Sequence, residues 1–166
     1  MSLKPPIPSH ERTPQARLSE AGMHAILGYQ LAQAGIVTTQ VFEAQVGGEA
    51  GLRRGEFTLL ALVQGNPDVT ARQLARALAV TPPNVALWIE KLQARGLLSR
   101  ERSSSDARMQ HIRITPRGSR KVDQAVQALL QGERSALSTL SPAEHAMLLE
   151  LLHKVALARG RHEPAA

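Results

Sequence analysis

The stretch from Thr70 to Thr115 restricts the fold of this chain more than any other part of it. Thr70 and Gln73 match a capping box, in which the threonine oxygen accepts the amide three residues on and the glutamine side chain reaches back. Apolar residues then recur at helical spacing, at Leu74, Ala75 and Leu78. The pattern therefore predicts a short helix that begins just after Thr70.

A second helix is predicted from Thr81 to Arg95. Thr81 supplies an N-cap and Pro82 occupies the first helical position, where the missing N–H of proline costs nothing, while Gly96 suits the C-terminal end. One face is apolar and consists of Val85, Trp88, Ile89 and Leu92. The opposite face consists of Pro83, Asn84, Leu87, Glu90, Lys91 and Ala94. We expect the apolar face, Trp88 included, to pack into a core.

A basic β-hairpin is predicted after this helix. Leu97–Arg102 can form a strand, Ser103–Asp106 has turn chemistry, and Gln110–Ile114 alternates polar and apolar residues as a returning strand. Thr115 and Pro116 then cap another helix. Helix, tight turn, helix and hairpin in this order make a winged helix-turn-helix, which holds one helix against DNA. Residues 81–95 would be the recognition helix and residues 103–110 the tip of the wing.

The positive charge of the chain is concentrated around this motif. The formal net charge is +6. Between Ala50 and Lys121 there are 13 Lys and Arg against 5 Asp and Glu, whereas the remainder has 7 against 9. A surface that faces phosphate would concentrate cations in this way, and charge scattered for solvation would not.

Several function classes are disfavoured by what the sequence lacks. No cysteine occurs, which excludes disulfides and thiolate metal sites, and the histidines are too dispersed for a metal motif. The first residues lack the apolar stretch of a signal peptide, and no run approaches the length of a membrane helix. We expect a cytoplasmic protein that needs no metal, cofactor or membrane.

Further helices are predicted on both sides of the motif. Apolar spacing from Leu18 to about Val46 predicts one long or once-bent helix, in which Gly22, Gly28 and Gly35 require close packing as compensation. A shorter helix is predicted over residues 53–64 and a longer one over residues 117–139.

A last helix begins with the capping box of Ser141 and Glu144. Its apolar band is too wide for a terminal helix of a monomer and consists of Met147, Leu148, Leu149, Leu151, Leu152 and Val155. The first and last helices are therefore the best candidates for a two-fold interface. The predicted fold is mainly α with a small β-hairpin: an arm (1–17), a helical dimerisation lobe (18–50 and 117–160), a winged helix-turn-helix domain (51–116) and a tail (161–166).

With this order of elements, the chain resembles the MarR family of bacterial transcriptional regulators over nearly everything after Arg17. The most specific part is VALWIEKLQARGLLSRERSSSDARMQHIRITPRG, which is similar to the family's recognition helix, wing and next helix start. The likeness is carried by Leu92, Gly96, Leu97, Arg100, Arg102, Asp106, Arg108, Thr115 and Gly118. It implies a homodimeric regulator of transcription, in most cases a repressor.

The resemblance implies particular roles for the wing. Arg108, with Arg102 at the strand end, would enter or flank the minor groove, where narrow A·T segments concentrate negative potential. Asp106 would orient an arginine through a charge-assisted pair. Alternatively, Asp106 is only a turn residue and Arg108 a solvated strand end.

The predicted recognition helix departs from the family pattern. Members often carry Ser, Thr and an arginine on the first exposed turns, where this chain has Pro83, Asn84, Ala86 and Leu87. Asn84 can form a bidentate hydrogen bond with adenine, and Pro83 and Leu87 can contact thymine methyls, so a palindromic, A/T-leaning operator on double-stranded DNA is expected. Phosphate contacts are expected from Arg72, Arg76, Lys91 and the amides behind Thr70 and Thr81. Arg53 and Arg54 either reach phosphate or are solvated.

Regulators similar to this chain are commonly released from DNA by small anionic or phenolic ligands. The resemblance places the ligand between the helical lobe and the winged domain, near Met23, His24, Ile26, Leu27, Tyr29 and Phe57. His24 could receive an acid or a phenol, although a solvated or capped histidine is the alternative. A coupling of ~1 to 3 kcal/mol between ligand and operator would suffice for release.

Two other function classes compete with this interpretation. A winged-helix module that binds a protein partner would lack the steep salt dependence that several phosphate contacts impose. An enzyme is the remote alternative, because no activated nucleophile, Gly-rich phosphate loop or carboxylate cluster occurs.

Overall fold

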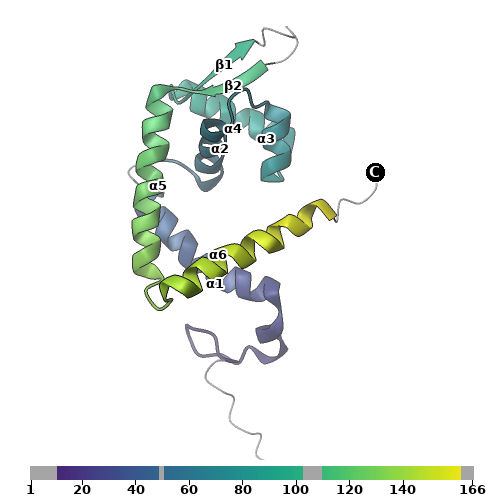
Figure 1. Ribbon diagram of the computed structural model, residues 1–166, viewed down its shortest axis with the longest axis vertical. Coiled ribbons are helices and arrows are strands. Elements are labelled where there is room, and N and C mark those ends of the chain that lie inside the picture. Colours follow the sequence, from purple (N-terminus) through teal and green to yellow (C-terminus); the bar gives the residue numbers. More distant parts are fainter. Residues whose placement is uncertain (1–10, 49–50, 103–109, 162–166) are drawn as a thin grey trace, which may run out of the picture.

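The protein is mainly helical and has one two-stranded antiparallel sheet. The computed structural model describes residues 11–48, 51–102 and 110–161 (Figure 1). Its elements are a 3-10 turn (Ala21–Ala25), α1 (Leu27–Phe42), a π-helical turn (Glu43–Gly47), α2 (Arg54–Gly65), α3 (Ala71–Leu78), α4 (Pro82–Ala94), β1 (Leu98–Arg102), β2 (Gln110–Ile114), α5 (Pro116–Ala136), α6 (Pro142–Leu157) and a last 3-10 turn (Ala158–Arg161). The predicted fold class is confirmed, because α3, α4 and the β1–β2 hairpin make a winged helix-turn-helix.

The long helix α5 connects two parts of the molecule. Figure 1 shows α2, α3, α4 and the hairpin gathered around the first half of α5, and α1 and α6 near its other end. Along the described ranges, no helix is long and apolar enough to cross a membrane.

The hydrophobic core lies in the winged part. Leu59 and Leu60 of α2, Leu74 of α3 and Ile89 of α4 are among its fully buried side chains. The ends of α1 and α5 complete this core with Phe42, Val46, Val122 and Ala125. Burial of this many large apolar groups, each worth about 1.5 to 3 kcal/mol, makes the winged part the stable body of the chain.

The helical lobe is packed very differently. No residue of α6 is buried, and most of its large apolar side chains are exposed. Gly28 and Gly35 of α1 also face open space, because a Cβ added at either would have nothing within 4 Å. The close packing expected for these glycines is therefore absent within one chain.

The first predicted helix is wrong in its N-terminal third. Leu18 and Ser19 belong to a tight hairpin instead, in which Ser19 pairs with Arg12 across a β-bridge. A 3-10 turn follows, and Ile26 breaks the helical path with extended dihedrals (φ −90°, ψ 113°) before α1 begins. Glycines on both sides of this break weaken the continuous helix, so local hairpin hydrogen bonds prevail there.

Thr81 precedes α4 as predicted, but its side chain makes no capping hydrogen bond. Pro82 and Pro83 have no N–H to offer, and the amide of Asn84 bonds to the carbonyl oxygen of Thr81 at 3.0 Å. The one amide that the threonine hydroxyl could cap, that of Asn84, is thus bonded to the Thr81 carbonyl oxygen instead, and the two prolines fix the helix start by their backbone geometry. The capping roles of Thr70, Thr115 and Ser141 are confirmed.

Gly118 permits the closest contact between α5 and the hairpin. The Thr115 hydroxyl accepts the Gly118 amide at 3.0 Å and donates to the carbonyl oxygen of Gly96 at 2.8 Å. A Cβ at Gly118 would overlap the Leu97 carbonyl oxygen and lie 2.8 Å from Cγ1 of Ile114. The Thr-x-x-Gly sequence is therefore a packing requirement at the base of the wing.

We predict that Gly118→Ala lowers the free energy of unfolding by about 1 to 3 kcal/mol, because the methyl group must displace backbone. Urea unfolding at fixed protein concentration measures this loss. Gly65→Ala is the matched control, since an added Cβ there has nothing within 4 Å. Equal stability of the two variants would contradict the close packing at Gly118.

Candidate nucleic-acid interface

The turn between α3 and α4 sets the angle at which α4 is presented. Thr70 accepts the Gln73 amide at 3.3 Å, and Gln73 Oε1 accepts the Thr70 amide at 2.9 Å, which completes the capping box of α3. Ala79 ends α3 in the left-handed conformation (φ 53°, ψ 42°), and the Val80 amide donates a hydrogen bond to the carbonyl oxygen of Ala75. The chain therefore reverses within three residues and starts α4 at Pro82.

Helix α4 has one buried face and one open face, as the sequence predicts. Val85, Ile89 and Leu92 are fully buried, and Trp88 packs against the same core beside Gly55. The open face carries Pro83, Asn84, Leu87, Glu90, Lys91 and Ala94. Leu87 keeps 47% of its surface exposed, which is unusual for a leucine in the best-packed part of the chain.

Helices α3 and α4 also carry cations, and one of them, Lys91, belongs to the open face of α4. Arg72, Arg76 and Lys91 are exposed, and within the described ranges none of them forms an ion pair with a carboxylate. Such groups are available to an external anion at no cost of a broken pair.

The wing projects from the same part of the molecule. β1 and β2 pair in register from Leu98 opposite Ile114 to Arg102 opposite Gln110. The tip of the wing, with Asp106 and Arg108, lies outside the described residues. Arg102 occupies the last paired position of β1, so it is placed at the boundary of that tip.

The base of the wing is anchored by charged residues that the sequence analysis did not single out. Arg113 pairs with Asp68 and, through Nε, with Glu101 at 3.3 Å. His111 Nδ1 lies 2.6 Å from the Asp68 carbonyl oxygen, and the Ile112 amide donates to Val69 at 2.9 Å. These contacts fix the hairpin to the residues just before α3. The only signal in the sequence for these contacts is that Glu101 and His111 face each other on the two predicted strands.

A second ion pair fixes the C-terminal end of α4. Glu56 is only 5% exposed; its Oε2 accepts the Arg53 amide at 3.1 Å and lies 3.5 Å from Nη1 of Arg95. Arg95 also donates to the Gly51 carbonyl oxygen at 3.0 Å. Burial and the nearby guanidinium groups of Arg95 and Arg117 lower the pKa of Lys121.

Arg53 and Arg54 are both exposed at the start of α2. The Arg54 guanidinium lies over the Phe42 ring, 5.5 Å from its centroid, which favours a cation–π contact over a role at phosphate. At the far end of the chain, Arg159 donates to the carbonyl oxygens of Ala77 (3.3 Å) and Arg76 (3.4 Å) at the end of α3.

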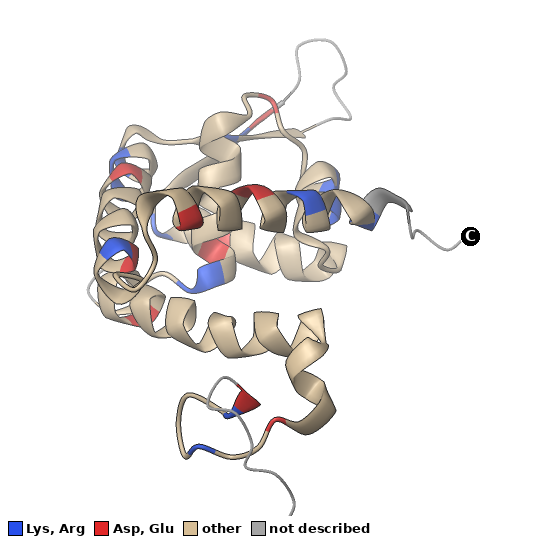
Figure 2. Ribbon diagram, turned by 60° about the horizontal axis from the view of Figure 1, so that its bottom comes forward, with Lys and Arg blue, Asp and Glu red and all other residues tan. Residues whose placement is uncertain are grey.

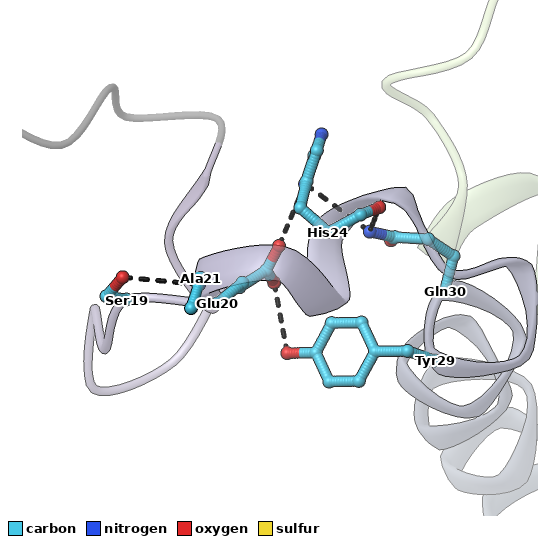
Figure 3. Close-up of polar contacts among 6 residues, drawn as sticks. All are labelled: Ser19, Glu20, Ala21, His24, Tyr29 and Gln30. Atoms are coloured by element: carbon cyan, nitrogen blue, oxygen red, sulfur yellow. Dashed lines mark hydrogen bonds and ion pairs between the residues drawn. The ribbon is translucent and has the colours of Figure 1, made fainter.

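The residues predicted for a ligand divide into two groups. Figure 3 shows Glu20 between His24 and Tyr29; its carboxylate lies 2.9 Å from His24 Nδ1 and accepts the Tyr29 hydroxyl at 3.2 Å. Met23, Ile26 and Leu27 of the same segment are exposed. Phe57 lies apart from them and packs on Phe42, with ring centroids 5.8 Å apart.

The network around Glu20 was missed by the sequence analysis, which considered His24 and Tyr29 separately. Desolvation, the hydrogen bond to Glu20 and its negative charge raise the pKa of Tyr29. Among the described residues, no three metal-ligating side chains come together.

A cavity of about 420 Å³ lies between α2 and α3, and one of about 410 Å³ lies where α5 meets α6. Neither cavity is lined by the predicted ligand residues.

Comparisons with known proteins agree with this geometry. The family model described as MarR family matches residues 50–109. A protein of Thauera aromatica, assigned as a transcriptional regulatory protein for the hcr operon, is 26% identical over 140 residues, which cover 84% of each chain.

Two solved structures are similar over nearly their whole length. A transcriptional repressor named CouR, solved on a 23-mer DNA duplex, is 26% identical with a TM-score of 0.76, over 84% of this chain and 98% of its own. BpsR of Bordetella bronchiseptica, whose DNA binding is regulated by 6-hydroxynicotinic acid, is 25% identical with a TM-score of 0.70, over 80% and 94%. These likenesses span the winged motif and both flanking helical parts, and they make the chain similar to the MarR family of transcriptional regulators in sequence and in fold.

Proposed function

We propose that the chain is a homodimeric, sequence-specific DNA-binding regulator that represses transcription until a small aromatic, phenolic or acyl ligand releases it. The observation that carries this proposal is the open face of α4, where Asn84 and Leu87 are exposed on a helix fixed by a buried stripe. A rigid helix with exposed polar and apolar groups suits the major groove. The protein would act in the cytoplasm, where its operator is.

The first turns of α4 would contact the bases. Asn84 has both a donor and an acceptor and can bind the N6 and N7 edge of adenine, while Pro83 and Leu87 offer apolar contact to thymine methyls. An A/T-leaning operator follows. With a single amide for direct recognition, much of the affinity must come from phosphate contacts.

Exposed cations and the N-termini of helices would make the phosphate contacts. Arg72, Arg76 and Lys91 have no competing carboxylate within the described ranges, and the amides behind Thr70 and Thr81 add donors. On the wing, Arg102 and Arg108 would lie at the minor groove, with Asp106 orienting an arginine.

The homodimer would form through α1 and α6. Figure 2 shows α1 without a single charged position, and three of its large side chains, Leu27, Leu31 and Ile36, are exposed. Helix α6 adds a continuous band of exposed apolar groups. Such a surface is unfavourable in water, and pairing with a second copy would bury it.

The proposed ligand site lies at the N-terminal end of α1 and on the turn before it. Regulation of BpsR by 6-hydroxynicotinic acid supports a small aromatic acid as the class of effector. Met23, Ile26 and Leu27 are exposed on one segment, beside the half-buried His24 and Tyr29, and this segment becomes a pocket only if another surface covers it. Phe57 would belong to that pocket only through movement of α2.

We predict that Asn84→Ala relaxes sequence preference by ~1 to 3 kcal/mol at one base pair in each half-site. Titration of operator variants at fixed salt measures this effect. Gln127→Ala, at an exposed amide on α5, is the control and should leave preference unchanged. A loss of affinity spread evenly over all sequences would make Asn84 a backbone contact instead.

We predict that Arg108→Ala weakens binding to operators with A/T flanks more than to operators with G/C flanks, because only the former narrow the minor groove. The slope of log K on log salt should fall by ~0.9 for the lost phosphate-region contact. The two flank sequences serve as internal controls, and unchanged affinity for both would argue against insertion of the wing.

We predict that the double substitution Met147→Glu and Leu151→Glu converts the protein to a monomer and abolishes operator binding. Both side chains are exposed on α6, so folding of the single chain should persist, whereas buried charge would disrupt the dimer. Sedimentation equilibrium gives the oligomeric state, and Glu150→Gln on the same helix is the control. A wild-type monomer, or DNA affinity without salt dependence, would favour a protein-binding winged module.

A further inference from the structure

The end of α4 and the start of α5 lie side by side and bring three cations together. The hydroxyl of Thr115, the N-cap of α5, donates to the carbonyl oxygen of Gly96 at 2.8 Å. Arg95, the C-cap of α4, directly precedes that glycine, and Arg117 and Lys121 lie on the first turns of α5. Because the latter two are four residues apart, they share one face of α5. We call the surface made by Arg95, Arg117 and Lys121 the cationic corner.

Two glycines lie beside the guanidinium groups of the cationic corner. Arg95 donates to the Gly51 carbonyl oxygen at 3.0 Å, and its Nη2 would lie 3.8 Å from a Cβ added at Gly51. Nη1 of Arg117 would lie 3.9 Å from a Cβ added at Gly96. Both glycines have a left-handed backbone, with φ of +56° and +67°, which disfavours any other residue. Neither position can readily carry a side chain that would cover the guanidinium beside it.

Positive charge exceeds negative charge at the cationic corner. Glu56 is 5% exposed and lies 3.5 Å from Arg95. In the part of the chain that the structure describes, no carboxylate forms an ion pair with Arg117 or Lys121. Among the described residues, three cations therefore face one carboxylate, which leaves two positive charges without compensation.

The pKa of Lys121 shows that this excess acts on its neighbours. Burial is the main cause that lowers it, and repulsion from Arg95 and Arg117 lowers it further. An anion beside the ammonium group would favour the charged form and raise this pKa again. The free protein thus holds the three cations together against a repulsion that a bound anion would relieve.

We propose that Arg95, Arg117 and Lys121 bind the phosphate group of a small phosphorylated ligand. A phosphate dianion matches the two uncompensated charges, and each guanidinium can present two parallel N–H groups to its oxygens. A carboxylate ligand has too few oxygens to engage two guanidinium forks and an ammonium group. Lys121 is half-buried, so a compact anion reaches it more readily than a phosphate held in a duplex does.

This site goes beyond the proposed function. It shares no residue with the proposed ligand segment at residues 23–29 or with the open face of α4, and it does not depend on DNA binding. A bound phosphate would link α4 to α5, since Arg95 belongs to the end of one helix and Arg117 to the start of the other. Occupancy would therefore stabilise the winged part.

Pyrophosphate is the probe, because it carries phosphate groups without a base or an acyl chain. Calorimetric titration of the full-length protein at fixed ionic strength gives its dissociation constant. We expect Arg117→Gln and Lys121→Gln each to raise this constant about tenfold, because each removes one charge-assisted contact. The matched control is Arg134→Gln, which removes an exposed cation near the other end of α5 and should leave the constant unchanged.

A second measurement uses the wild-type protein and needs no variant. Lysine amines are acetylated with and without pyrophosphate, and the modified positions are identified by mass spectrometry. We expect pyrophosphate to protect Lys121 at least several-fold and to leave Lys154, an exposed lysine of α6, unprotected. Equal protection of both lysines would contradict the site.

The titrations distinguish this site from other ways of binding anions. Equal dissociation constants for all four proteins would assign binding to diffuse surface charge and overturn the inference, as would the absence of measurable binding. If pyrophosphate does not bind, and the two variants instead lower the slope of log K on log salt for the operator by ~0.9 each, the cationic corner contacts duplex phosphate, which also overturns it. Operator binding without pyrophosphate binding leaves the proposed function intact, and the reverse leaves this inference intact.

Discussion

Burial of one face of α4 is the constraint on which the rest of the molecule depends. Val85, Ile89 and Leu92 have no exposed surface, and they leave the helix only one rotation about its axis. That rotation turns Asn84 and Leu87 outward. The left-handed turn at Ala79 and the Glu56–Arg95 pair then fix the two ends of the same helix. The proposed recognition by α4 would thus be a consequence of packing, and the exposed side chains of this helix can vary without loss of the fold.

Much of this could be predicted because it is local. The stripe of α4, the capping boxes at Thr70 and Ser141 and both strands follow from spacing and from residue types a few positions apart. Thr81 is the exception: two prolines follow it, and the Asn84 amide that its hydroxyl would cap is bonded to the Thr81 carbonyl oxygen instead. The break at Ile26 was missed because a hairpin and the buried Glu20 outweigh a helical pattern already weakened by glycine.

Contacts between distant residues escaped prediction. Arg113 with Asp68 and Glu101, and Arg95 with Glu56, join positions that no periodicity relates. The difference in packing between the winged part and the helical lobe was not predicted either. The core lies in the winged part, whereas α6 has no buried residue. In the proposed homodimer, the stability of the helical lobe would therefore depend on protein concentration.

The ion pairs at the base of the wing have a consequence for measurements of operator affinity. Arg113, Asp68 and Glu101 have partly exposed side chains, so dissolved ions screen their attraction. Raising the ionic strength would therefore act twice: it would weaken the proposed phosphate contacts, and it would weaken the ion pairs that fix the hairpin to the residues before α3. A counterion count derived from binding curves would include this intramolecular part and overestimate the number of phosphates touched.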